Sequence, residues 1–137
     1  MAGPQLTSLG YLNAKHNGAV RCFDVQDGIL YSGGDDGVIF RFDSSSGYQF
    51  ECFYPTKQQE GTPVPIICLK LCYSRQGPVL LTGEGSGRVK VMGTGQRQTL
   101  GTVGFFQNIP VTALSAFVSN GVFAVLGDRT VHIMQWR

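Results

Sequence analysis

Four polar residues near the start of the chain could together cleave an acyl bond. His16 is followed, within one short stretch, by Ser32, Asp35 and Asp36. A histidine that takes a proton from a serine while an aspartate orients it is the arrangement of a serine hydrolase. The alternative is a structural set of polar side chains that hydrogen-bond one another inside the fold. The elements that carry the four residues decide which interpretation holds.

Those elements are short alternating apolar runs separated by glycine-rich turns. The clearest are ILYSGGDDGVIFRF (29–42), VLLTGEGSGRVKV (79–91) and VFAVLGDRTVHIM (122–134). An apolar run, a polar turn with glycine and a second alternating run predict a β-hairpin. We find no stretch with helical periodicity, so the sequence predicts an all-β fold.

The strand-like runs recur with a period. Val20, Ile66 and Val111 begin three similar runs that lie 46 and 45 residues apart. A period in this range predicts a repeat architecture, in which each unit buries its apolar face against the next. The units cover about 5–47, 48–96 and 97–137 of a single domain spanning 1–137. The hairpins align without a gap when Ser32, Thr82 and Ala124 coincide.

The first unit, HNGAVRCFDVQDGILYSGGDDGVIFRFD, resembles the WD repeat of the WD40 β-propeller family. It has the histidine before an inner strand, the serine on the second strand and the aspartate in the next turn, with Phe42-Asp43 in place of Trp-Asp. The other two units are degenerate. In the second, Ser86 replaces the aspartate and Met92 the tryptophan. In the third, Asp128 is retained and Met134 takes the tryptophan position.

The resemblance implies a structural role for the opening residues. In WD repeats the matching side chains form a hydrogen-bonded set, which here would be His16, Ser32 and Asp36, without an indole donor at Phe42. A hydrolase would need a nucleophile elbow or an oxyanion site beside the serine, and YSGGD leads from a strand into a turn and another strand rather than into a helix. We therefore expect no catalytic residues and no enzymatic activity.

The number of units predicts that the ring is completed by another chain. Propellers typically have 4–8 blades, so three blades cannot close a ring. We expect two copies to form one six-bladed ring, with the segment Gln5–Leu12 of each copy completing the last blade of the other. A heteromeric ring and a trimer of nine blades are the alternatives.

The family resemblance implies a protein-interaction scaffold subunit in a larger intracellular complex, with a protein or peptide ligand on a propeller rim. The alternative function is an RNA-associated subunit of an RNA-processing complex, which would need Lys15, Arg21, Arg88 and Lys90 on one rim. The predicted ligand contacts lie in loops of one rim. They are Asn17, Arg21, Asp35, Glu84, Ser86 and Arg129.

Composition narrows the classes of partner and the cellular location that the sequence allows. A net charge of +2 does not call for a nucleic-acid or membrane partner, and no apolar run approaches the ~20 residues of a membrane-spanning helix. The N-terminus lacks a secretory-signal pattern. The four cysteines form no CxxC pair, which favours free thiols in a reducing compartment over disulfides and predicts neither a metal nor a cofactor. The cysteines are Cys22, Cys52, Cys68 and Cys72.

Overall fold

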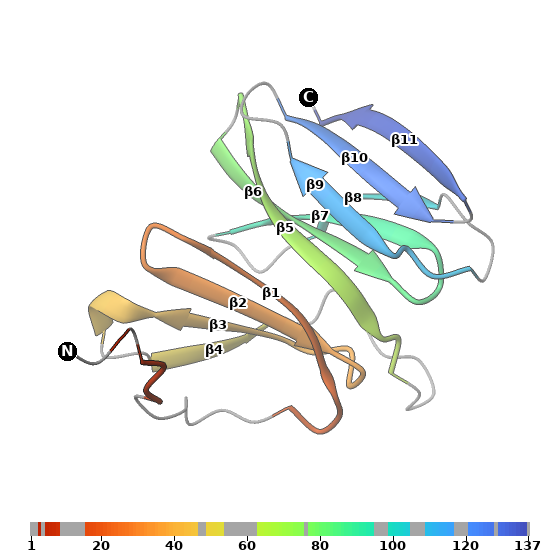
Figure 1. Ribbon diagram of the computed structural model, residues 1–137. Coiled ribbons are helices and arrows are strands. Elements are labelled where there is room, and N and C mark those ends of the chain that lie inside the picture. The colour runs from red at the N-terminus through yellow and green to blue at the C-terminus, as the bar shows by residue number, and fades with distance from the viewer. Residues whose placement is uncertain are drawn as a thin grey trace.

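The chain folds into three antiparallel β-sheets that follow one another in sequence and in space (Figure 1). The computed structural model describes residues 3, 5–8, 16–46, 49–53, 63–75, 77–94, 99–104, 109–116, 121–127 and 129–136, with the backbone alone at 46 and 49–53. The all-β class and the three propeller-like units predicted from the sequence are therefore present. We call the three sheets blades 1, 2 and 3.

Blade 1 is a four-stranded meander in which each strand pairs with the next along the chain. A tight turn at Asp27-Gly28 joins its first two strands, and both residues have the positive φ that such a turn requires. A short 3-10 helix, η1 (Ser44–Ser46), precedes the last strand. The strands are β1 (Val20–Gln26), β2 (Ile29–Gly34), β3 (Ile39–Asp43) and β4 (Gln49–Phe53).

Blade 2 repeats this order with four strands, and blade 3 has three in the order β11-β10-β9. The segments around 49–53 and 99–104, which begin the second and third sequence units, are the last strands of blades 1 and 2. The blades are thus offset by one strand from the sequence units. The strands are β5 (Ile66–Ser74), β6 (Gly77–Glu84), β7 (Arg88–Gly93), β8 (Thr99–Gly104), β9 (Ala113–Ala116), β10 (Val122–Gly127) and β11 (Thr130–Gln135).

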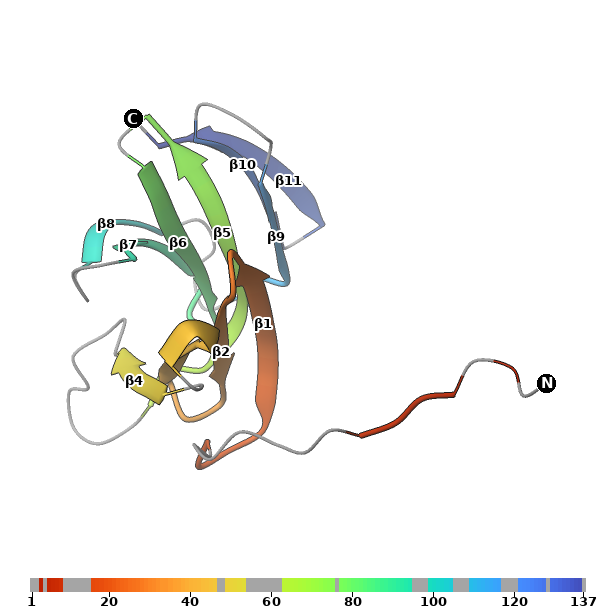
Figure 2. The ribbon, with the colours of Figure 1, turned by 90° about the vertical axis from the view of Figure 1, so that its left-hand side faces the viewer.

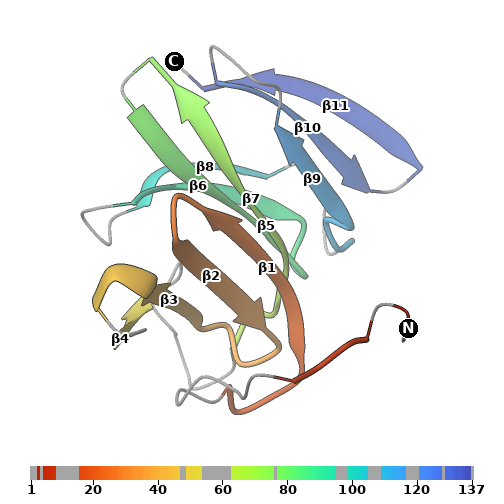
Figure 3. The same ribbon diagram turned by 60° about the vertical axis from the view of Figure 1, so that its left-hand side comes forward.

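The first strands of the blades, β1, β5 and β9, lie next to one another, and the remaining strands fan outward from them (Figure 3). Two apolar cores fill the joints between successive blades, so burial comes from stacking sheets face to face. The core of the joint between blades 1 and 2 contains Tyr31, Ile39, Ile66, Leu69, Leu71, Leu80 and Met92. The core between blades 2 and 3 contains Cys72, Val79, Leu81, Val89, Val91, Val111, Phe123 and Val125.

In the third hairpin the observed strand pairing differs by one residue from the alignment predicted from the sequence. Ser32 pairs with Phe40 across blade 1 and Thr82 with Lys90 across blade 2, whereas Val125 pairs with His132 across blade 3. Val125, not Ala124, therefore stands in register with Ser32 and Thr82. The reason is a shorter turn, since only positions 128 and 129 separate the paired Gly127 and Thr130.

The N-terminal segment forms no strand where it is described. Gln5–Ser8 have no regular structure and run away from the three sheets (Figure 2). The rest of the predicted strand, 9–12, lies outside the described residues, as does the predicted turn residue Asp128. Within the described residues, no helix is long and apolar enough to cross a membrane.

Candidate functional site

The structure brings the three polar residues of the first unit into one hydrogen-bonded set. His16 Nε2 lies 2.8 Å from Ser32 Oγ, and its Nδ1 lies 3.0 Å from both carboxylate oxygens of Asp36. With its proton on Nδ1, His16 donates to Asp36 and accepts from the Ser32 hydroxyl. The set ties the loop before β1 to β2 and to the β2–β3 turn.

Asp36 is the centre of this set. Its carboxylate also accepts from the backbone N–H of Asn17 at 2.8 Å and of Val38 at 3.2 Å. Burial raises the pKa of Asp36, but the hydrogen bonds from His16, Asn17 and Val38 outweigh that effect and lower the pKa below its usual value. The His16 and Asp36 side chains are both buried. The arrangement satisfies each polar group inside a stable turn, as a structural set requires.

Aromatic packing takes the place of the missing indole. The ring of Phe40 meets the His16 ring edge-on, with centroids 4.7 Å apart, and Phe42 lies 6.2 Å from Phe40. Both phenylalanines are buried. Edge-to-face packing favours this geometry, so the imidazole is held in place without a tryptophan N–H.

In blade 2 an ion pair joins the end of β6 to β7, the part that corresponds to the His16 set of blade 1. Lys90 Nζ lies 3.0 Å from Glu84 Oε2, and Ser86 donates to Glu84 Oε1 at 3.0 Å. Lys90 stands directly across from Thr82, in the place that Phe40 takes in blade 1. The Thr82 hydroxyl is buried and has no hydrogen-bond partner among the described residues.

The predicted contact residues divide between surface and interior. Arg21 and Asp35 are paired through two hydrogen bonds of 2.8 Å, and both belong to the exposed part of blade 1. Asn17 is exposed beside them, and Arg129 is exposed at the β10–β11 turn with a positive φ. Glu84 is buried inside blade 2, so it is unavailable for the surface contact that the sequence suggested.

Two of the four basic residues that an RNA-binding rim would need are neutralised. Arg21 is held by Asp35, and the hydrogen bond between them raises the pKa of the guanidinium. Lys90 is buried against Glu84. Arg88 is exposed, and Lys15 lies outside the described residues. The described rim is therefore of mixed charge, which does not favour a polyanion.

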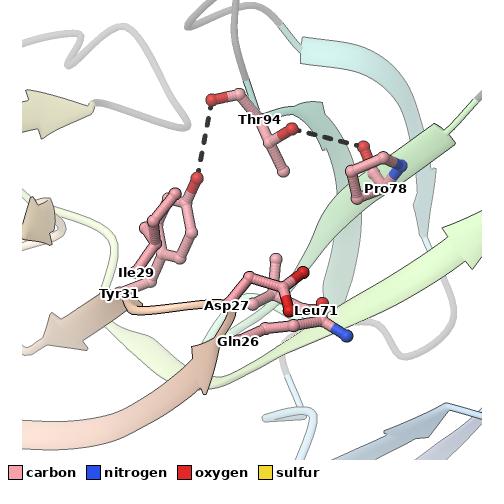
Figure 4. A pocket seen from close by; sticks show the side chains of 7 residues that line it. All are labelled: Gln26, Asp27, Ile29, Tyr31, Leu71, Pro78 and Thr94. Atoms are coloured by element: carbon pink, nitrogen blue, oxygen red, sulfur yellow. Dashed lines mark hydrogen bonds between the residues drawn. The ribbon is translucent and has the colours of Figure 1, made fainter. Parts of the chain in front are cut away.

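The opposite rim has a pocket that the sequence did not predict. It lies between blades 1 and 2, with a volume of about 80 Å³ and a mostly apolar lining (Figure 4). The Tyr31 hydroxyl points across it to the Thr94 carbonyl at 3.5 Å. The pocket depends on the contact of two blades, so no local sequence pattern could have identified it. Its lining residues are Gln26, Asp27, Ile29, Tyr31, Leu71, Pro78 and Thr94.

Metal and thiol chemistry have little support in the described ranges. No cluster there contains three histidine, cysteine, aspartate or glutamate side chains that could hold a metal ion. Cys22, Cys68 and Cys72 are free, and burial raises the pKa of the Cys22 and Cys68 thiols to about 12. Such thiols are protonated at neutral pH and react slowly.

Comparison with known proteins identifies the fold. No protein-family model and no curated protein matches the chain. Solved structures do match. The WD40 repeats of RRP9 give a TM-score of 0.73 at 21% identity, over 91% of this chain and 38% of that one. The structure of U3-55K gives 0.73 at 20% identity over the same shares. Chaetomium thermophilum Sqt1, bound to the N-terminus of ribosomal protein L10, gives 0.69 at 15% identity, over 85% and 32%.

These likenesses show that the three sheets are blades of a WD40-type β-propeller, in agreement with the repeat pattern of the sequence. The chain covers less than half the length of each protein compared. It therefore corresponds to a part of such a propeller.

Proposed function

We propose that this chain is a WD-repeat domain that acts as a non-enzymatic protein-interaction scaffold in an intracellular complex. The observation that carries the proposal is the polar rim of blade 1, where Arg21 at the start of β1 pairs with Asp35 in the β2–β3 turn. The His16–Asp36 hydrogen bonds hold that turn in place. A rigid sheet that presents polar loops is suited to binding rather than to chemistry. In support, the Sqt1 structure has a ribosomal protein N-terminus bound.

The ligand that fits this rim is a polar peptide of mixed charge. Arg21 and Asp35 satisfy one another in the free protein, and their side chains are 51% and 34% exposed. A peptide with a carboxylate and a basic group can exchange partners with this pair, so that no charge is left unpaired on binding. Asn17 and Arg129 supply further exposed contacts on the same side of the blades.

Affinity purification from cells that make the tagged chain tests this function. We expect a set of co-purifying proteins that is reduced at least tenfold by Arg21→Glu, combined with Asn17→Ala and Arg129→Glu. Asp27→Asn, on the opposite rim, is the matched control and should retain the set. Equal recovery by the rim variant and by wild type would contradict the proposal.

A further inference from the structure

The pocket between blades 1 and 2 has walls that are fixed by the packing of the joint. Tyr31 and Leu71 belong to the buried core of that joint and are 2% and 8% exposed. The backbone N–H of Leu71 also donates to the Asp24 carboxylate at 2.8 Å, which ties β5 to β1 beside the pocket. The pocket is therefore formed in the free chain, and a ligand can enter it with little rearrangement.

Asp27 is the one charged residue among those that line the pocket. It is exposed in the β1–β2 turn, and the Tyr73 hydroxyl of blade 2 donates to its Oδ2 at 3.2 Å. Within the described residues no other group hydrogen-bonds to this carboxylate, so Oδ1 can accept from a ligand. The turn itself does not require the charge, since Asn-Gly suits the same kind of turn as Asp-Gly.

The apolar part of the pocket adjoins this carboxylate. Figure 4 shows Asp27 on one side of the pocket and Thr94 on the other, with apolar side chains beside them. Those side chains include Ile29, Leu71 and Pro78. An apolar wall that ends at a carboxylate complements a group with a hydrocarbon stem and a cationic end.

The volume of the pocket favours lysine among such groups. About 80 Å³ is far below the ~300–1,000 Å³ of pockets for whole small molecules, so the occupant is a single side chain. It is also about half of the ~150 Å³ cavity that encloses benzene, which leaves little room for the flat guanidinium group of arginine. Lysine has a compact ammonium group on an unbranched four-carbon stem and is narrower.

We propose that this pocket receives a lysine side chain of a partner peptide, with the ammonium group against Asp27 and the stem against Ile29 and Leu71. The pocket is on the rim opposite to Arg21 and Asp35, so it is a second binding surface and does not depend on the ligand of that rim. Because the Asp27 carboxylate is exposed, solvent screens its attraction for the cation, and a single lysine binds weakly.

Titration of the ¹⁵N-labelled 137-residue chain with N-acetyl-lysine-N-methylamide, followed by two-dimensional NMR at low salt, tests the proposal. We expect saturable shifts of the Gln26, Asp27 and Leu71 amide signals, with a Kd on the order of 1–10 mM for a ligand of this size. The norleucine analogue has the same stem without the ammonium group. It should bind about fivefold more weakly, the upper end of the effect of an exposed ion pair.

Asp27→Asn separates the ligand contact of Asp27 from its place in the turn. Asp27 has a φ of 54°, a conformation that asparagine also adopts readily, so the turn should be retained. The preference for the lysine analogue over the norleucine analogue should disappear in this variant. Asp35→Asn removes the same charge from the opposite rim, so it is the matched control and should keep the preference.

Three results would each overturn the proposal: no saturable shifts at the pocket, equal binding of the lysine and norleucine analogues to wild type, or a lysine preference that survives Asp27→Asn. Tighter binding of the arginine analogue than of the lysine analogue would also do so. Partners held by the Arg21–Asp35 rim should still co-purify with Asp27→Asn. Failure of the pocket is therefore distinguishable from failure of the rim.

Discussion

The carboxylate of Glu84 lies 3.0 Å from the ammonium group of Lys90, with both side chains buried, where blade 1 has a histidine set over Phe40. The two blades thus stabilise the same region by different means. In blade 1 the His16 imidazole links a serine to an aspartate. In blade 2 a strand lysine crosses to the glutamate that precedes the turn, and Ser86 donates to the same carboxylate.

Breaking the Glu84–Lys90 pair from one side should destabilise the chain strongly. Lys90→Met leaves the buried Glu84 carboxylate without its cation, which costs about 3–5 kcal/mol. Replacing both, with Glu84→Gln and Lys90→Met, should cost much less, because no uncompensated charge remains. Urea unfolding of the single and double variants gives these free energies.

The exposed Arg21–Asp35 pair is the matched control for that experiment. Exposed ion pairs contribute little to stability, so Arg21→Ala should leave the unfolding midpoint nearly unchanged. Equal losses from Lys90→Met and Arg21→Ala would show that burial of the pair does not matter.

Removal of the His16 ring should lower stability without loss of any hydrolytic activity. His16→Ala leaves the buried Ser32 hydroxyl without its partner and removes the imidazole donor of the Asp36 carboxylate, which keeps its bonds from Asn17 and Val38. We expect a cost of about 1–3 kcal/mol. His132→Ala, at an exposed histidine on β11, is the control and should cost far less. Thermal unfolding measures stability, and chromogenic ester substrates measure activity. Ester cleavage by wild type that disappears in both His16→Ala and Ser32→Ala would contradict the structural role.

Repeat period and turn chemistry predicted most of this fold, because both are local signals. Alternating apolar residues around glycine turns identified the hairpins β2–β3, β6–β7 and β10–β11, and the spacing of Val20, Ile66 and Val111 identified the three units. The residues of the His16 set could also be named in advance, because the first unit resembles a WD repeat and the resemblance implies that its matching side chains form such a set.

The parts that could not be predicted depend on contacts between strands. The predicted register of the third hairpin was wrong by one residue. Strand β10 is apolar on both faces, so its sequence pattern does not reveal that the following turn is one residue shorter. The sequence predicts Glu84 in the rim turn between the second and third strands, whereas it is the last residue of β6 and is buried. Its burial depends on Lys90, which only the β6–β7 pairing brings within reach.

Stability should fall at acidic pH partly through Asp36. The pKa of its carboxyl in the folded chain lies below the usual value, so the folded state binds the proton less readily than the unfolded chain does. This contribution is complete above the unfolded pKa of about 3.9 and is lost as the pH falls through the lower folded pKa. Unfolding free energies between pH 7 and pH 2 measure it.

Asp36→Asn isolates that contribution. The variant has no carboxyl at this site, so its stability should depend less steeply on pH below pH 4 than that of wild type. The pKa values of Asp35 and Asp43 are also lowered, by hydrogen bonds from Arg21 and Ser45, and both remain in the variant. Identical acid profiles for the two proteins would exclude a linked proton at Asp36.

Close approach of blades should make Gly33 sensitive to a single added methyl group. A Cβ at Gly33 would lie 2.7 Å from Cγ2 of Ile66, the first residue of β5, which is buried in the joint and cannot withdraw freely. Gly33→Ala should therefore destabilise the chain by about 1–3 kcal/mol, the usual range for overpacking a core. Gly104→Ala is the control, because a Cβ there meets no atom within 4 Å. Urea unfolding compares the two. The joint is tightly packed only if Gly33→Ala is the more destabilising, and restoration of its stability by Ile66→Val would assign the effect to this one contact.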